Sequence, residues 1–324
     1  MLDPFRDPPT WDAVTALLDV IAPGSAVLTI DPVPGLFRSA THRVDARMAN
    51  GRILHIAIRR YAENSEHDPR ERAVRQFRIL TLMHEHGIPV VRPLYLDDEG
   101  SLLGAPGIAT MRAPGQPNLL PEDPPAWAEA MGRMLARIHR VPCDETIRDT
   151  LPYANAESTR FLHVDALPEE LAAHPDGPLV WQTVRDLLPT QAQAPSAITH
   201  MNYWPGNVYW DDDGEISAVV DWEEVSYGDP GIDVAHCRMA LSLTGRSQSA
   251  DEFLAAYEDE AGHPVVNLGL WELAAAAGAM PNLTWGMDEV QRQRELVPHM
   301  TMTPESVCEA FRHFIAGAMR RAGF

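Results

Sequence analysis

The chain has 324 residues, 45% hydrophobic and 22% charged, which is long enough for a full core and neither disordered nor fibrous in composition. Its formal net charge of −20, from 26 Lys and Arg against 46 Asp and Glu, excludes the basic surface that a nucleic-acid-binding protein normally shows. Three widely spaced cysteines, Cys143, Cys237 and Cys308, argue against a disulfide framework and for a reducing, cytoplasmic setting.

No segment has the pattern of a membrane anchor or of a signal peptide. The longest apolar run, LGLWELAAAAGAM, contains Glu272 and is too short to cross a bilayer. The N-terminal MLDPFRDPPTWD is acidic and broken by prolines, so we expect neither a signal peptide nor a membrane partner. The negative charge has two interpretations, because it either steers a cationic small molecule towards the protein or is simply a soluble, well-charged surface.

The first third of the chain predicts a small antiparallel sheet with one long helix inserted. Apolar residues recur at helical spacing over 11–21, and HRVDARMA and RILHIAIR then flank Asn50-Gly51, the strongest local signal of a β-hairpin. Helical spacing returns over 69–86, before VVRPLYL and GIATM bracket a DDEGS turn. We expect the apolar stripe of the 69–86 helix to consist of Val74, Phe77, Leu80 and Met83.

The remainder predicts a mainly helical domain. Helical patterns cover 127–138, 178–188, 231–243, 250–261, 268–279 and 304–321. Ser249 and Glu252 have the spacing of a capping box, and Thr303 is the expected N-cap before Pro304. Two short strands, NVYW and ISAVVDW, are joined by an Asp-Asp-Asp-Gly turn. We therefore expect an α+β fold whose smaller sheet lobe, residues 1–112, and larger helical lobe, residues 113–324, leave a cleft between them.

The hairpin of NVYW and ISAVVDW carries the candidate metal site. Asn207 leads into its first strand and Asp221 ends its second, so we expect a carboxamide oxygen and a carboxylate to converge. Oxygen ligands of this kind suit Mg²⁺, which binds one or two protein carboxylates beside substrate phosphates. Asn202, five residues before Asn207, can face the same point as a group that orients a hydroxyl. A divalent ion, such a group and a cleft together predict phosphoryl transfer.

An ordered series of motifs extends this pattern over about residues 25–240. The central ones are His200-x-Asn202-x-x-x-x-Asn207, Val-Val-Asp221-Trp-Glu, and Tyr-Gly-Asp229-Pro followed by Asp233-Val-Ala. Around them lie IAIRRY, VRQFRILTLMHEHGIPVVRPLY, GIATMRAPG and WAEAMGRMLARIHRV. This series resembles the aminoglycoside phosphotransferase family, small-molecule kinases with a protein-kinase-like fold.

The resemblance implies transfer of the γ-phosphate of ATP or GTP to a hydroxyl of a small molecule, with Mg²⁺ held by Asn207 and Asp221. It implies a nucleotide-binding lobe at 1–112, and a catalytic loop, metal site and substrate pocket in 113–324. Its nucleotide-binding residues would be Arg59 at the phosphates and Met111 and Ala113 at the hinge. Antibiotic resistance is only one option, because the family also phosphorylates macrolides, choline, homoserine and other alcohols. The expected partner is a hydroxyl-bearing small molecule, and the expected state is a monomer or a dimer.

Departures from the family pattern concern the phosphate site and the catalytic residue. Asn202 stands where the family normally has Asp, so it can orient the substrate hydroxyl but cannot take its proton, which implies a much slower enzyme. Arg59 replaces the usual Lys and keeps the charge. Gln76 replaces the helical acid expected to pair with it, unless Glu71 substitutes from an earlier turn. The segment PVPGLFRSATH has only Gly35, so Ser39 and backbone amides would have to hold the phosphates.

Several candidate residues also have plainer interpretations. His200 is either a proton carrier or a structural histidine bonded to nearby backbone, and Asp229 is an N-cap as well as a family residue. Asp233 is expected to brace the catalytic loop, and Glu223 either lines the metal site or is surface. The triplet of acids at 211–213 is expected to be a solvated turn.

The acceptor pocket and the activity itself have alternatives. A pocket for a polyamine-like sugar and the ordinary faces and cores of helices are both compatible with Glu258, Trp271, Glu272, Trp285, Asp288 and Glu289. Asn202 is compatible with a slowed kinase, with a catalytically silent nucleotide- or ligand-binding pseudokinase, and with a replacement introduced to trap a complex. Sequence motifs of hydrolases and of protein kinases are missing.

Overall fold

The computed structural model describes residues 7–33, 39–62, 68–283, 287 and 302–324. The chain forms two compact units. Unit 1 consists of Met1–Pro114 with Ser217–Glu223, and unit 2 of Gly115–Ile216 with Glu224–Phe324. The sequence division at 112/113 thus runs near the first boundary, while the segment Ser217–Glu223 belongs with unit 1. The roles assigned to the two parts stay predictions.

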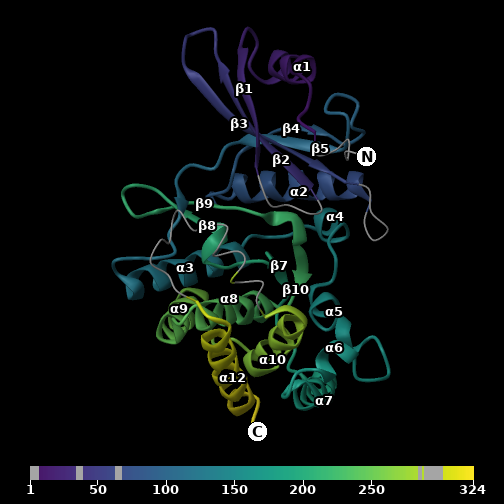
Figure 1. Ribbon diagram of the computed structural model, residues 1–324, viewed down its shortest axis with the longest axis vertical. Helices are drawn as coiled ribbons and strands as arrows, with labels where there is room; N and C mark the ends of the chain where they lie inside the picture. Colours follow the sequence, from purple (N-terminus) through teal and green to yellow (C-terminus); the bar gives the residue numbers. More distant parts are fainter. Residues whose placement is uncertain (1–6, 34–38, 63–67, 284–286, 288–301) are drawn as a thin grey trace. The chain divides into compact units, whose positions relative to one another are not determined.

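Five strands in the described part of unit 1 form an antiparallel sheet in the order β1-β2-β3-β5-β4 (Figure 1). They are β1 (Ala26–Val33), β2 (Ser39–Arg47), β3 (Ile53–Tyr61), β4 (Pro93–Asp97) and β5 (Gly107–Met111). The hairpin predicted at Asn50-Gly51 is confirmed, because Gly51 has a φ of 83° and β2 pairs with β3 from Arg47 opposite Ile53 to Ser39 opposite Tyr61. Glycine tolerates this left-handed conformation without a steric cost.

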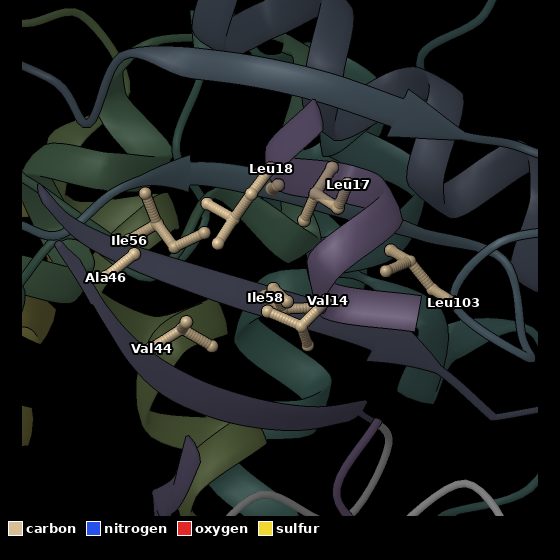
Figure 2. Packing of buried hydrophobic residues seen from close by; sticks show 9 residues of the cluster. Val14, Leu17, Leu18, Val44, Ala46, Ile56, Ile58 and Leu103 are labelled. Carbon is tan, nitrogen blue, oxygen red and sulfur yellow. The ribbon is translucent and has the colours of Figure 1, made fainter. Parts of the chain in front are cut away.

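Helix α1 (Trp11–Ile21) covers one face of this sheet. Its N-cap is Thr10, and its apolar side contributes Val14, Leu17 and Leu18 to the core. Figure 2 shows these side chains directed at the sheet residues Val44, Ala46, Ile56 and Ile58, with Leu103 beside them. Because side chains alternate along a strand, Ala57 and Arg59 face the side of the sheet opposite to Ile56 and Ile58. That side carries the polar residues of the candidate site.

Helix α2 (Pro69–Glu85) contacts β3, β4 and β5. Asp68 caps it by accepting a hydrogen bond from the backbone N–H of Arg70 at 2.8 Å. Its buried residues are Arg72, Ala73, Gln76, Ile79, Leu80 and Met83. The predicted stripe is therefore right for Leu80 and Met83 and wrong for Val74 and Phe77, which are half-buried. Two polar residues, Arg72 and Gln76, are buried on this helix, where the predicted stripe was apolar.

Unit 2 is mainly helical, as expected. Its longer helices are α3 (Pro124–His139), α7 (Gly177–Leu187), α8 (Gly231–Leu243), α9 (Ser247–Ala261), α10 (Leu268–Ala279) and α12 (Pro304–Arg321). Short helices are α4 (Glu145–Arg148), α5 (Ala154–Ser158) and α6 (Glu169–Ala172), with 3₁₀ turns η1 (Arg160–Leu162), η2 (Leu188–Thr190), η3 (Pro205–Asn207) and η5 (Met280–Asn282). None of the helices in the described ranges is long and apolar enough to span a bilayer.

Short strands of unit 2 surround the catalytic-loop candidates. Strand β7 (Ala197–Thr199) pairs with β10 (Ser226–Gly228), and β6 (Gln116–Pro117) pairs with β8 (Val208–Trp210). Strand β9 (Ile216–Val219) runs from unit 2 into unit 1, where the turn η4 (Trp222–Glu224) follows. The acids at 211–213 are exposed in a turn in which Asp211 accepts backbone hydrogen bonds, as predicted.

Two helix starts test the capping predictions. Thr303 caps α12 as expected, with a capping box that it forms with Ser306. The box predicted for Ser249 and Glu252 is wrong, because α9 begins at Ser247 and both residues lie inside the helix. The α+β fold class is confirmed, with the sheet in unit 1 and most helices in unit 2.

Candidate functional site

The sheet face opposite α1 carries a row of polar side chains at the start of β2 and the end of β3. The register places Thr41 opposite Arg59 and Ser39 opposite Tyr61. Ser39 and Thr41 are two residues apart on β2, as are Arg59 and Tyr61 on β3. All four side chains therefore lie on one face of the sheet. The Nε of Arg59 donates a hydrogen bond to the Oγ1 of Thr41 at 3.1 Å, which holds the guanidinium along this face.

Arg59 binds both acids that follow β9. Its Nη1 lies 3.1 Å from the Oδ1 of Asp221 and 2.8 Å from the Oε1 of Glu223. The side chains are mostly buried, with 18% of Arg59, 27% of Asp221 and 10% of Glu223 exposed. Burial acts to lower the pKa of the Arg59 guanidinium, but the charges of Glu223 and Asp221 outweigh it, so that the pKa is raised. Arg59 is therefore a permanent cation in contact with two carboxylates.

Arg72 of α2 is a second cation in this cluster. Its side chain is 4% exposed, its Nη2 lies 2.6 Å from the Oε2 of Glu223, and its guanidinium lies 5.1 Å from the centroid of the Tyr61 ring. Glu223 also accepts a hydrogen bond of 2.5 Å from the Oγ of Ser39. Burial and the charge of Glu223 raise the pKa of the Tyr61 phenol, which stays neutral. Glu223 is thus the shared partner of two arginines and a serine.

The position on α2 where the sequence predicted a partner of Arg59 does not make this contact. Gln76 is buried on α2, but its Oε1 has no hydrogen-bond partner, so it does not bind Arg59. Glu71 is exposed in the first turn. Sequence reasoning missed Arg72 and left Glu223 between metal site and surface. The available signal was the spacing of Arg72 and Gln76, four residues apart on the helix face that also carries Leu80 and Met83.

Asp221 is held in an unusual backbone conformation. Its φ is 66°, in the left-handed region that non-glycine residues seldom adopt. The segment before it is fixed by a hydrogen bond from the N–H of Val219 to the carbonyl of Pro89 at 2.7 Å, and the indole of Trp222 donates to the carbonyl of Val219 at 3.0 Å. Strained residues of this kind persist where the surroundings hold them, often at functional sites.

The catalytic-loop candidates lie together in unit 2. The amide nitrogen of Asn207 donates to the backbone carbonyl of Asn202 at 2.9 Å, so the side-chain oxygen of Asn207 takes no part in this bond. The backbone N–H of Asn202 donates to the Nδ1 of His200 at 3.3 Å. His200 is completely buried, and this contact with nearby backbone is the one that its structural interpretation predicts. Its role as a proton carrier stays a prediction.

Asp233 of α8 braces this loop, as predicted. Its carboxylate accepts the backbone N–H groups of His200 at 2.6 Å and of Met201 at 2.7 Å, and lies 3.1 Å from the Nε2 of His139. Met201 has a φ of 64°, so the brace holds a second strained residue. Burial acts to raise the pKa of Asp233, but its hydrogen bond with His139 and the neighbouring charges lower it below its ordinary 3.8. Asp229 in turn accepts the N–H of Gly231 at 2.8 Å, at the start of α8.

Other predicted site residues are placed as follows. Met111 ends β5, packs partly buried against the core of unit 1, and precedes half-buried Ala113. Gly35 lies outside the described residues. Asn207 belongs to unit 2 and Asp221 to unit 1, so the convergence of these two side chains stays a prediction. In the described ranges no three His, Cys, Asp or Glu side chains form a metal-binding group.

A comparison with known families identifies the family of this chain. The sequence profile of the phosphotransferase enzyme family (APH) matches residues 24–268, three quarters of the chain. The chain belongs to this phosphotransferase family. The matched range contains Ser39, Arg59, Asn202, Asn207 and Asp221.

Solved structures show the same protein-kinase-like fold. A structure from Ralstonia eutropha JMP134, described as a candidate aminoglycoside phosphotransferase, has a TM-score of 0.63 at 16% identity over 95% of this chain and 96% of that chain. The macrolide 2′-phosphotransferase of Brachybacterium faecium has a TM-score of 0.58 at 19% identity, over 90% and 98% of the two chains. A spectinomycin phosphotransferase in complex with ADP and spectinomycin has 0.59 at 14% identity, over 96% and 97%. At these identities the likeness concerns the fold.

A curated mouse protein is also similar in sequence. The acyl-CoA dehydrogenase family member 10 of Mus musculus is 28% identical over 193 residues. The match covers 52% of this phosphotransferase-family chain and 17% of the mouse protein. The chain thus corresponds to a small part of that relative.

Proposed function

We propose that the chain transfers the γ-phosphate of ATP or GTP to a hydroxyl of a small molecule. The observation that carries this proposal is the contact of Arg59 with Asp221 and Glu223 on the sheet face opposite α1, in a chain of the phosphotransferase family. A cation fixed beside two carboxylates suits a metal-bound nucleoside triphosphate, because the cation can bind phosphate oxygens and a carboxylate can bind the metal ion. We also propose that the protein is cytoplasmic and is a monomer or a dimer.

Asp221 and Asn207 would hold Mg²⁺, and their chemistry fits it. One carboxylate and one amide oxygen make a hard-oxygen set that leaves room for waters and phosphates, as Mg²⁺ prefers. When bound, the metal ion would neutralise charge on the phosphates. The contact of Arg59 with Asp221 is compatible with this set, because Arg59 can exchange a carboxylate oxygen for a phosphate oxygen.

The remaining residues would position the reactants. Arg59 would bind phosphate oxygens with its forked guanidinium while Glu223, held by Arg72 and Ser39, keeps it in place. In unit 2, Asp233 fixes the backbone of His200 and Met201, and therefore the position of Asn202. Asn202 would orient the acceptor hydroxyl through its amide. It cannot remove the hydroxyl proton, which would leave to water or to the transferred phosphate.

The amide at position 202 also supports a second candidate function. A chain that keeps Arg59, Asp221 and Asn207 but lacks a base could bind nucleotide without transferring phosphate, as a catalytically silent sensor. The two candidates share the nucleotide site and differ only in turnover, so one pair of measurements separates them.

Nucleotide binding is tested first. We expect millimolar Mg-ATP or Mg-GTP to raise the melting temperature, because a ligand at one hundred times its Kd stabilises the folded state by about 2.7 kcal/mol. The rise should disappear in Asp221→Ala and persist in Glu224→Ala, a matched control at an exposed acid three residues away. An unchanged melting temperature with both nucleotides would reject the kinase and the sensor alike.

Turnover is tested next with Asn202→Asp. A carboxylate restores a proton acceptor, so we expect ATP turnover with water as acceptor to rise by about 10²-fold or more. Asn202→Ala serves as the control, because it removes the amide without adding a base. Binding of Mg-ATP with equal, negligible turnover in all three proteins would favour the silent sensor.

A further inference from the structure

A cavity of about 420 Å³ lies in unit 2 beside the loop that carries Asn202. Its walls come from Met201 and Trp204 of this loop, from α8 and from α10. The volume falls in the range of roughly 300–1,000 Å³ that small-molecule sites occupy. The cavity therefore has the size and the position of an acceptor site.

The walls of this cavity are largely apolar. The helices contribute Ile232, Met239, Leu243, Trp271, Ala274 and Ala275. Within the described part of the chain, Glu157 is the one carboxylate of the lining, and the lining includes no Lys or Arg. His236 also lines it, and burial lowers the pKa of its imidazole below the ordinary 6.5, so that it adds no charge at neutral pH. Of the acids expected for a sugar pocket, Glu272 does not line the cavity, because it is completely buried between Arg238 and Arg321.

Of the other members of the expected acidic set, the structure describes Glu258 and Trp271. Glu258 accepts the backbone N–H of Val265 at 2.9 Å and does not line the cavity. Trp285, Asp288 and Glu289 lie outside the described residues. Of the described members of the set, Trp271 lines the cavity, with an apolar ring in place of a charge.

We propose that the acceptor is a neutral alcohol with an apolar body, bound in this cavity with its hydroxyl at the Met201 end. The proposal rests on the phosphotransferase function above and names its substrate class. Burial of apolar surface would favour such a ligand. An ammonium group would lose its hydration here and meet one carboxylate, Glu157, among the described lining residues, so a polycationic aminoglycoside fits poorly.

The same helix builds the cavity and positions the loop. Asp233 of α8 holds the backbone N–H groups of His200 and Met201, while its neighbours Ile232 and His236 line the cavity. A hydroxyl at the Met201 end therefore lies beside the residue that precedes Asn202 in the chain. The Nδ1 of His236 is buried without a hydrogen-bond partner, and provides a polar group for orienting a ligand in a largely apolar wall.

Gly278 of α10 offers a matched set of variants. It lines the cavity and is exposed, and a Cβ added there meets no atom within 4 Å. Its φ is outside the left-handed region, so other residues fit the helix without strain. Gly278→Phe narrows the cavity, Gly278→Asp adds a second carboxylate, and Gly278→Ala changes little and is the control.

The experiment measures binding of octanol, of aminooctanol with an ammonium opposite its hydroxyl, and of kanamycin by ligand-observed saturation-transfer NMR. We expect wild type and Gly278→Ala to bind octanol about ten-fold more tightly than aminooctanol, with no kanamycin binding. Gly278→Phe should weaken octanol about ten-fold, and Gly278→Asp should favour aminooctanol. Tighter binding of kanamycin or aminooctanol by wild type, no octanol binding, or equal octanol binding by Gly278→Phe would overturn the proposal.

The Mg-ATP thermal shift, measured on the same samples, separates this proposal from the proposed function. Octanol binding that responds to the Gly278 variants without any Mg-ATP shift overturns the kinase function and leaves the apolar cavity standing. An Mg-ATP shift with a preference for kanamycin supports the kinase function and overturns the neutral acceptor.

Discussion

At the scale of single residues, the candidate nucleotide site depends on Glu223. This carboxylate contacts Arg59 at 2.8 Å, Arg72 at 2.6 Å and Ser39 at 2.5 Å, and connects β2, β3 and α2. Two buried guanidinium groups need a counter-charge, since an unpaired buried charge is costly. Glu223 therefore stabilises unit 1 as well as orienting Arg59.

We predict that Glu223→Gln lowers the free energy of unfolding by about 3 kcal/mol, because Arg72 loses its carboxylate partner in a buried setting. Glu224→Gln, at the exposed neighbouring acid, should change it by less than about 0.5 kcal/mol. Urea denaturation of both variants measures the difference. Equal effects would show that the arginines find other partners when Glu223 is neutral.

The sequence predicted the residue types of this site better than their contacts. Arg59, Asp221 and Ser39 could be named from motifs, and the structure brings all three to Glu223 or to one another. The cross-strand pair of Thr41 with Arg59 follows from the Asn50-Gly51 hairpin once the register is known. The contact of Arg72 with Glu223 joins residues 151 positions apart, and no local pattern encodes such a distance.

At the scale of elements, α8 has two tasks. Through Asp233 it fixes the catalytic-loop candidates, and through Ile232, Met239 and Leu243 it forms part of the apolar cavity. It also carries Arg238, which binds Glu272 of α10 at 2.9 Å. The bounds of the longer helices followed from periodicity to within about three residues, whereas the short helices α4, α5 and α6 were not predicted. At the start of α9, a Ser-x-x-Glu pattern inside the helix imitated a capping box.

The buried His236 of α8 gives a pH-dependent prediction. Burial lowers its pKa below 6.5 in the folded state, while the nearby charge of Asp233 and a bond with the backbone of Tyr203 oppose this without cancelling it. Because the unfolded state then binds the proton more tightly, its contribution to stability is complete above pH 6.5 and is lost as the pH falls below it. We expect urea denaturation to show this loss as the pH falls below 6.5.

The matched variant is His236→Gln, which cannot titrate. Its stability should change less than that of wild type over the same pH interval, whereas His84→Gln, at an exposed site on α2, should follow wild type. Parallel curves for wild type and His236→Gln would mean that the imidazole gains a proton in the folded protein without cost.

At the scale of the whole molecule, the net charge of −20 acts on stability. Like charges repel most in the compact state, and salt screens them because the Debye length falls from about 30 Å at 0.01 M to about 8 Å at 0.15 M. We predict that the melting temperature rises by on the order of 2 °C over this range of sodium chloride. A falling melting temperature would show that the ion pairs, such as Arg238 with Glu272, contribute more than the repulsion does.

The division of the chain into units could be predicted only in part. The change from strand-like to helical patterns near residue 112 lies close to the first boundary, but the position of Ser217–Glu223 in unit 1 depends on packing. The hydrogen bond from Val219 to Pro89 and the ion pairs of Asp221 and Glu223 with Arg59 fix this segment. These contacts arise from tertiary structure, which residue patterns along the chain do not express.

The position of Ser217–Glu223 in the sequence determines when unit 1 is complete during synthesis. A fragment that stopped after Pro114 would lack Glu223, which contacts both Arg59 and Arg72, so we expect it to be less stable than the complete unit. Seven residues encoded about a hundred codons downstream complete it. Unit 1 is therefore complete only after about half of unit 2 has been synthesised.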